Sequence, residues 1–83
     1  MTVGDLIKDK DYELIEYRMT IPEDINGVKD ILFGYCKSKN GKLIPLDGDS
    51  YYESDEIIKY EEWSNEDYNN CLTVVIKGEW TTG

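Results

Sequence analysis

The sequence contains no histidine and only two cysteines. Histidine is the commonest general base and metal-ligating side chain, so its absence removes the usual residue of acid–base catalysis and zinc binding. Cys36 and Cys71 are too few for a disulfide scaffold and form no C-x-x-C zinc pair. Because each cysteine lies in an apolar run, we expect two free, buried thiols. We therefore expect a protein that is not an enzyme and that binds no metal or cofactor.

Basic residues are also scarce, since nine Lys and Arg stand against eighteen Asp and Glu, for a net charge of −9. Nucleic acid and anionic membranes both attract clustered bases, so neither is expected as a direct partner. An acidic surface instead attracts a basic protein surface. No apolar run reaches the roughly 18 residues of a membrane span, and the first residues lack the basic start of a signal peptide. We expect a cytoplasmic protein.

The length of 83 residues predicts a single domain spanning residues 1–83. A chain this short buries only about 60–65% of the surface that its unfolded form exposes, so its core is small. The sequence is 40% hydrophobic and 12% aromatic. This composition favours a folded globule over a disordered chain despite the high charge.

The first residues predict a short helix. Thr2 can cap it, and Asp5 stands three residues later, where a capping box places its second member. Val3, Leu6 and Ile7 have the spacing of one apolar helical face. A helix of two turns is unstable alone in water, so this face must pack against another element.

Alternating apolar and polar residues predict five strands, and Asn40-Gly41 predicts a hairpin turn between two of them. Asn26-Gly27 predicts a second turn, and Gly34 is expected to let an aromatic ring approach its strand. The fold class is α+β, with the N-terminal helix packed on an antiparallel sheet of about five strands, mostly a meander. Such a helix cannot cover the whole sheet, so a homodimer is a possible state. The expected strands span residues 12–19, 28–37, 42–46, 56–63 and 71–80.

The most unusual stretch is residues 47–67, DGDSYYESDEIIKYEEWSNED, with nine acids and a single base, Lys59. Tyrosine and tryptophan residues are interleaved with the acids, and this combination is typical of protein-binding surfaces that complement a basic partner. The alternative to a binding surface is that these acids form a solvated face that only promotes solubility. The residues we expect to bind a partner are Asp47, Asp49, Tyr51, Tyr52, Glu53, Asp55, Glu56, Tyr60, Glu61, Glu62 and Trp63.

A sharper hypothesis is that carboxylates in this stretch imitate the phosphates of nucleic acid and occupy the groove of a nucleic-acid-binding host protein. Residues i and i+2 of a strand are about 6–7 Å apart, so Glu53 and Asp55 fit if their segment is extended. A calcium loop opening at Asp47 is disfavoured, because Tyr52 and Ile58 stand where such a loop needs Gly and Glu. The main alternative function is a structural or accessory protein that self-associates through its sheet.

Several segments carry a resemblance to known proteins. The V-x-D-L-I opening, the LDGD turn, the YEEW strand and the CLTVV strand resemble small uncharacterised proteins of Firmicutes phages and mobile elements. Asp5-Leu-Ile7 and Lys10-Asp-Tyr12 also resemble acidic type II anti-CRISPR proteins, which occupy the DNA-binding site of a nuclease. This second resemblance implies a non-enzymatic inhibitor whose partner is a basic protein.

Overall fold

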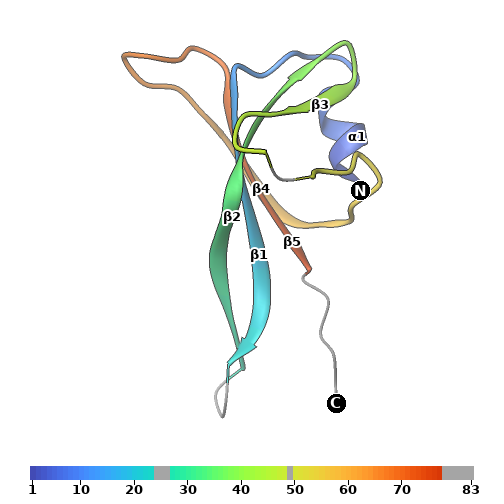
Figure 1. The fold of residues 1–83 in the computed structure, drawn as a ribbon, viewed down its shortest axis with the longest axis vertical. Coiled ribbons are helices and arrows are strands. Elements are labelled where there is room, and N and C mark those ends of the chain that lie inside the picture. Colours follow the sequence, from blue (N-terminus) through green and yellow to red (C-terminus); the bar gives the residue numbers. More distant parts are fainter. Residues whose placement is uncertain (24–26, 49, 78–83) are drawn as a thin grey trace.

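A short helix packs beside a five-stranded sheet in the computed structural model, which describes residues 1–23, 27–48 and 50–77 (Figure 1). Most of the described chain lies in strands. None of the helices in these ranges is long and apolar enough to cross a membrane. In chain order the elements are α1 (Val3–Ile7), β1 (Leu14–Glu23), β2 (Gly27–Lys39), β3 (Lys42–Pro45), β4 (Ile57–Trp63) and β5 (Cys71–Lys77).

The helix α1 begins as the sequence predicts. The backbone N–H of Asp5 donates to the Thr2 hydroxyl over 3.3 Å, and the Thr2 N–H donates to the Asp5 carboxylate over 2.9 Å. The predicted capping box is therefore confirmed, and the bond from the Thr2 backbone lowers the pKa of Asp5. Val3 and Ile7 are fully buried. With only five residues, α1 covers part of one sheet face.

The strand order is β3-β2-β1-β5-β4, and the β1–β5 pair is parallel. The expected antiparallel meander is therefore wrong as a description of the whole sheet. Strands β1, β2 and β3 do form a meander, but the chain then crosses to the far edge and returns as the β4–β5 hairpin. Strand β5 is buried along nearly its whole length, whereas β4 is largely exposed. An apolar strand such as β5 buries the most surface between two neighbouring strands. A charged strand such as β4 keeps its side chains solvated at the edge of the sheet.

The β2–β3 turn confirms the Asn40-Gly41 prediction. Both residues have positive φ, at 53° and 78°, as this two-residue turn requires. The other predicted turn, Asn26-Gly27, includes a residue outside the described ranges. Strands β1 and β2 are longer than predicted and pair with one another beyond Thr20, where the pairing of β1 with β5 ends. Pro22 lies in this outer part, where β2 is the only described neighbour of β1.

The core lies on one face of the sheet, between the strands on one side and α1 and the loop that carries Tyr51 on the other. Cys36 and Cys71 are both buried and free, which confirms their predicted state. Burial raises the pKa of the Cys36 thiol from an ordinary value of 9.0 to about 12. The buried hydrophobic residues of this cluster are Val3, Ile7, Tyr12, Ile15, Tyr17, Cys36, Tyr51, Leu72, Val74 and Ile76.

Gly34 makes room for the loop, as its sequence context predicts. A Cβ atom at this position would overlap the Tyr51 hydroxyl and the Asp47 carboxylate. The ring of Tyr51 packs nearly edge-on against the rings of Tyr17 and Phe33, with centroids 5.0 and 5.5 Å away. A small residue in β2 is therefore what allows the loop to close over the core.

Candidate functional site: a divided acidic stretch and a neighbouring pocket

The structure divides the acidic stretch of residues 47–67 into two parts. The first part is the loop over the core, residues 46–48 and 50–56 of the described chain, which we call the inner loop. Its acids Asp47, Glu53 and Asp55 accept hydrogen bonds from within the protein. The second part is β4 with the loop that follows it, where most side chains face solvent. The predicted binding residues therefore do not form one surface. Asp49 lies outside the described residues.

Asp47 anchors the inner loop to β2. Its carboxylate accepts the backbone N–H of Tyr35 at 2.9 Å and the Tyr51 hydroxyl at 2.6 Å. Tyr51 is only 7% exposed and belongs to the core cluster. Two of the predicted binding residues thus hold the fold together. Tyr51 is buried in the core, and Asp47, although exposed, holds its carboxylate against Tyr35 and Tyr51.

Asp55 and Glu53 have similar structural roles. The buried Tyr17 hydroxyl donates to the Asp55 carboxylate. Burial, and then this hydrogen bond, raise the pKa of Tyr17 well above its ordinary value of 10.0. The Glu53 carboxylate accepts the Leu43 N–H at 3.3 Å, and its carbonyl accepts the Gly4 N–H at 2.8 Å. A turn at residues 53–54 also breaks the extended run that phosphate mimicry by Glu53 and Asp55 would need.

Strand β4 supplies the exposed part. It is the last strand of the described sheet, and past Ile57, whose N–H donates to the Met1 carbonyl, no described strand lies beside its outer side. Ile58 and Tyr60 are 54% and 48% exposed. We call the following exposed residues of β4 and its flanking segments the acidic edge: Glu56, Ile58, Tyr60, Glu61, Glu66 and Asp67.

The remaining predicted residues are tied to neighbouring strands or lie beside the loop. Glu62 accepts a hydrogen bond from the Tyr12 hydroxyl and lies 3.8 Å from the Lys10 ammonium. Burial, followed by the hydrogen bond to Glu62, raises the pKa of Tyr12. The Trp63 indole donates to the Thr73 hydroxyl at 2.9 Å. Tyr52 is 61% exposed and lies on the inner loop.

The one base of the acidic stretch is engaged away from the acidic edge. The Lys59 ammonium lies 3.0 Å from the Asp30 carboxylate of β2, on the sheet face opposite the core. Hydrogen bonds from Lys59 and from Thr20 lower the pKa of Asp30. Because the Lys59 ammonium is directed toward β2, the charge at the outer edge of β4 is mainly the negative charge of its carboxylates.

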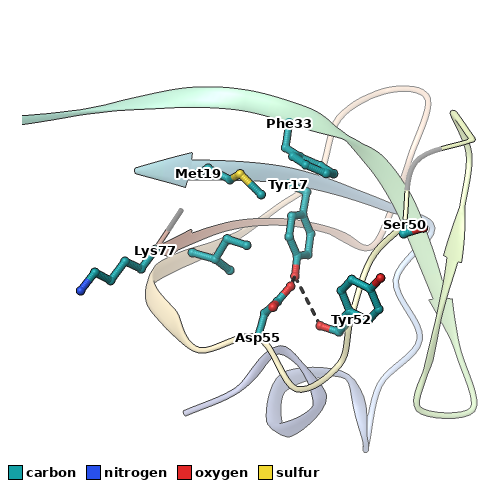
Figure 2. A pocket seen from close by; sticks show the side chains of 8 residues that line it. Tyr17, Met19, Phe33, Ser50, Tyr52, Asp55 and Lys77 are labelled. Carbon is teal, nitrogen blue, oxygen red and sulfur yellow. Dashed lines mark hydrogen bonds between the residues drawn. The ribbon is translucent and has the colours of Figure 1, made fainter. Parts of the chain in front are cut away.

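A pocket of about 400 Å³ opens on the core face beyond the reach of α1 (Figure 2). The sequence did not predict this pocket, because its residues come from β1, β2, the inner loop and β5. No single segment carries a signal for it, although the tyrosine–acid interleaving of the loop could have suggested internal pairs. Its lining residues are Tyr17, Met19, Phe33, Ser50, Tyr52, Asp55, Ile76 and Lys77.

The chemistry of the described residues gives no sign of a metal centre. Within the ranges that the structure covers, no three Cys, Asp or Glu side chains gather in a way that could hold an ion. The chain matches no protein-family model, no curated protein and no solved structure. Function must therefore be argued from the acidic edge and the pocket themselves.

Proposed function

We propose that this protein is a non-enzymatic binding protein of phage or mobile-element type that engages a basic protein through its acidic edge. One observation carries the proposal: β4 is the edge strand of the described sheet, with no described strand beside it past Ile57, and it presents carboxylates together with the exposed side chains of Ile58 and Tyr60. Backbone groups at a sheet edge can pair with an extended segment of another protein. The exposed Ile58 and Tyr60 add contact area, and the acids add charge complementarity.

Charge decides which partner the acidic edge accepts. A second copy pairing through β4 would bring Glu61 and its neighbours close to the same acids of the other chain, and like charges across strands are destabilising. A segment carrying Lys or Arg makes favourable pairs at the same positions. An inhibitor that enters the nucleic-acid groove of a basic host protein falls within this proposal, with β4 and the loop after it in place of Glu53 and Asp55. Its compartment would be the cytoplasm.

The proposal predicts salt-sensitive binding to an extended basic peptide. A suitable probe is a fluorescent peptide of alternating lysine and valine, titrated with the protein and followed by anisotropy. The double substitution Glu61→Lys and Glu66→Lys should weaken binding by roughly tenfold or more, as expected when close charge pairs are lost and reversed. Raising the salt from 0.1 M to 1 M should weaken wild-type binding, because the screening length falls from about 10 Å to about 3 Å.

The matched control is Asp9→Lys with Asp11→Lys, which changes the net charge by the same amount on the segment after α1. This control should retain most of the affinity if the acidic edge is the binding surface. An equal loss in both double variants would mean that only the overall charge attracts the peptide, and the proposal would then fail.

The second candidate function is self-association through β2. From Gly27 to Gly34, β1 is the only described strand beside β2, and Leu32 and Ile31 in this part are 45% and 38% exposed. Apolar surface of this kind favours a dimer whose stability does not weaken with salt. Sedimentation equilibrium at 0.1 M and 1 M salt separates the two candidates: a salt-independent dimer favours self-association, and a monomer at both salts favours the acidic edge.

A further inference from the structure

The pocket exists because the elements over the core face end before the sheet does. Helix α1 has only five residues, and the inner loop places Tyr51 over the middle of the sheet. Beyond them, Met19 and Phe33 are only partly buried where they pack against the core. Together with Ile76, these side chains form the apolar walls of the pocket; Met19 and Phe33 are labelled in Figure 2. A volume of about 400 Å³ lies within the range of small-molecule sites.

The polar end of the pocket offers acceptors. The Tyr17 hydroxyl donates to Asp55 and also lies 3.4 Å from the Tyr52 carbonyl (Figure 2). Burial raises the pKa of Tyr17, so its hydroxyl keeps its proton and acts as the donor, with Asp55 as the acceptor. One Asp55 oxygen accepts this bond, and a carboxylate can accept several. A ligand that reaches this end must therefore bring hydrogen-bond donors.

Electrostatics further restricts the ligand. The net charge of −9 disfavours an anion, and the Lys77 side chain extends with its ammonium directed away from the Tyr17–Asp55 pair (Figure 2). The partly buried ring of Phe33 packs 6.1 Å, between centroids, from the buried ring of Tyr17, and Asp55 lies at the hydroxyl end of Tyr17 (Figure 2). The pocket therefore has an aromatic wall and a carboxylate at its two ends. Aromatic rings and a carboxylate together stabilise an organic cation that has an apolar body.

We infer that this pocket binds a small primary amine with an aromatic or branched apolar body, its ammonium on Asp55 and its body against Met19, Phe33 and Ile76. This site is separate from the acidic edge and does not depend on the function proposed for it. A lysine side chain of another protein ends in the same head group. A compact ring can pack against Met19, Phe33 and Ile76 and loses less conformational entropy on binding than a flexible four-carbon stem.

Phenethylamine is a direct probe, and NMR of the methionine methyl groups reports its position. Met19 lines the pocket, whereas Met1 is 60% exposed and lies outside it, so Met1 serves as an internal control. At 0.15 M salt, phenethylamine should shift the Met19 methyl resonance saturably and leave Met1 unchanged. It should bind about tenfold or more tightly than 2-phenylethanol, because a charge-assisted hydrogen bond exceeds a neutral one. The anion 3-phenylpropionate should cause no saturable shift.

Variants at Asp55 and Ser50 test where the ammonium group of the ligand binds and where the ligand enters the pocket. Asp55→Asn keeps an acceptor for Tyr17 but removes the charge, so it should abolish the preference for the amine over the alcohol. Glu61→Gln makes the same charge change on the acidic edge and should preserve that preference. If Asp55→Asn does not fold, Ser50→Trp remains as a test, because Ser50 is an exposed lining residue and a bulky side chain there should weaken the binding of every ligand.

Three results would overturn the inference: no saturable shift of Met19, equal affinities for the amine and the alcohol, or retention of the amine preference in folded Asp55→Asn. Nα-acetyl-lysine methylamide should bind more weakly than phenethylamine. Tighter binding of the lysine compound would overturn the assignment to a free aromatic amine and assign the pocket to a lysine side chain.

Discussion

Replacing Gly34 by alanine is expected to destabilise the protein by about 1–3 kcal/mol, the usual cost of forcing extra atoms into a packed site. The added methyl group would overlap the Tyr51 hydroxyl and the Asp47 carboxylate, which are bonded to each other. Both groups are side-chain ends, but Tyr51 is held in the core and Asp47 is held by the Tyr35 N–H, so neither can move aside cheaply. Urea unfolding, followed by tryptophan fluorescence, measures the loss.

Whether Gly34→Ala lowers or raises the free energy of unfolding distinguishes a steric clash from a simple backbone effect. Gly34 is not among the glycines with positive φ, so alanine suits its backbone, and such a replacement normally stabilises a protein by about 0.4–1 kcal/mol. In a Tyr51→Phe background the cost of Gly34→Ala should shrink, because the hydroxyl that the methyl meets is gone. A Gly34→Ala protein as stable as the wild type would show that the loop does not close on β2 as described.

The second large effect is expected at alkaline pH. Burial raises the pKa of Tyr17 above 10.0 and that of Cys36 to about 12. A group whose pKa is higher in the folded state keeps its proton there, while the unfolded chain releases it near the ordinary value. The stabilisation is therefore complete below about pH 9 and is lost as the pH rises. Each such group removes about 1.4 kcal/mol of unfolding free energy per pH unit while only the unfolded state is ionised.

Tyr17→Phe separates the tyrosine from the other groups. At pH 7 this variant should be less stable by about 1 kcal/mol, because Asp55 loses its hydrogen-bond donor. Above pH 10 its stability should fall less steeply than that of the wild type, by about 1.4 kcal/mol per pH unit. Urea unfolding at intervals from pH 7 to pH 11 gives both slopes. Parallel slopes above pH 10 would contradict the buried, protonated state of Tyr17.

Local structure could be predicted well from the sequence, because each signal lies within a few neighbouring residues. The capping box of Thr2 and Asp5 and the Asn40-Gly41 turn were both correct. The close approach at Gly34 was also correct, although the sequence could not say that the ring belongs to Tyr51.

The parallel pairing of β1 with β5 could not be predicted from local patterns. It joins residues more than fifty positions apart, such as Ile15 and Leu72, and a meander is the simplest default for consecutive strands. A signal was nevertheless present. Residues 71–76 are apolar on both faces, which favours a central strand, whereas the acids of residues 56–63 favour an edge.

The acidic stretch shows why charge in a sequence does not by itself define a surface. Asp47 and Glu61 look equivalent as members of one acidic run. Both side chains are exposed in the structure, but the Asp47 carboxylate accepts hydrogen bonds from Tyr35 and Tyr51, whereas Glu61 lies on the solvent-facing strand β4. The difference depends on which tyrosines the fold brings to each carboxylate, and only the tertiary structure specifies those pairs.

The division of the acidic stretch is tested most directly by urea unfolding of two matched double variants. The inner pair is Asp47→Ala with Asp55→Ala, and the outer pair is Glu61→Ala with Glu66→Ala. The inner pair should lose about 1–3 kcal/mol for each carboxylate, because tyrosine hydroxyls in or near the core lose their acceptors. The outer pair should stay within about 0.5 kcal/mol of the wild type per substitution. Equal losses in the two variants would contradict the division into structural acids and an exposed acidic edge.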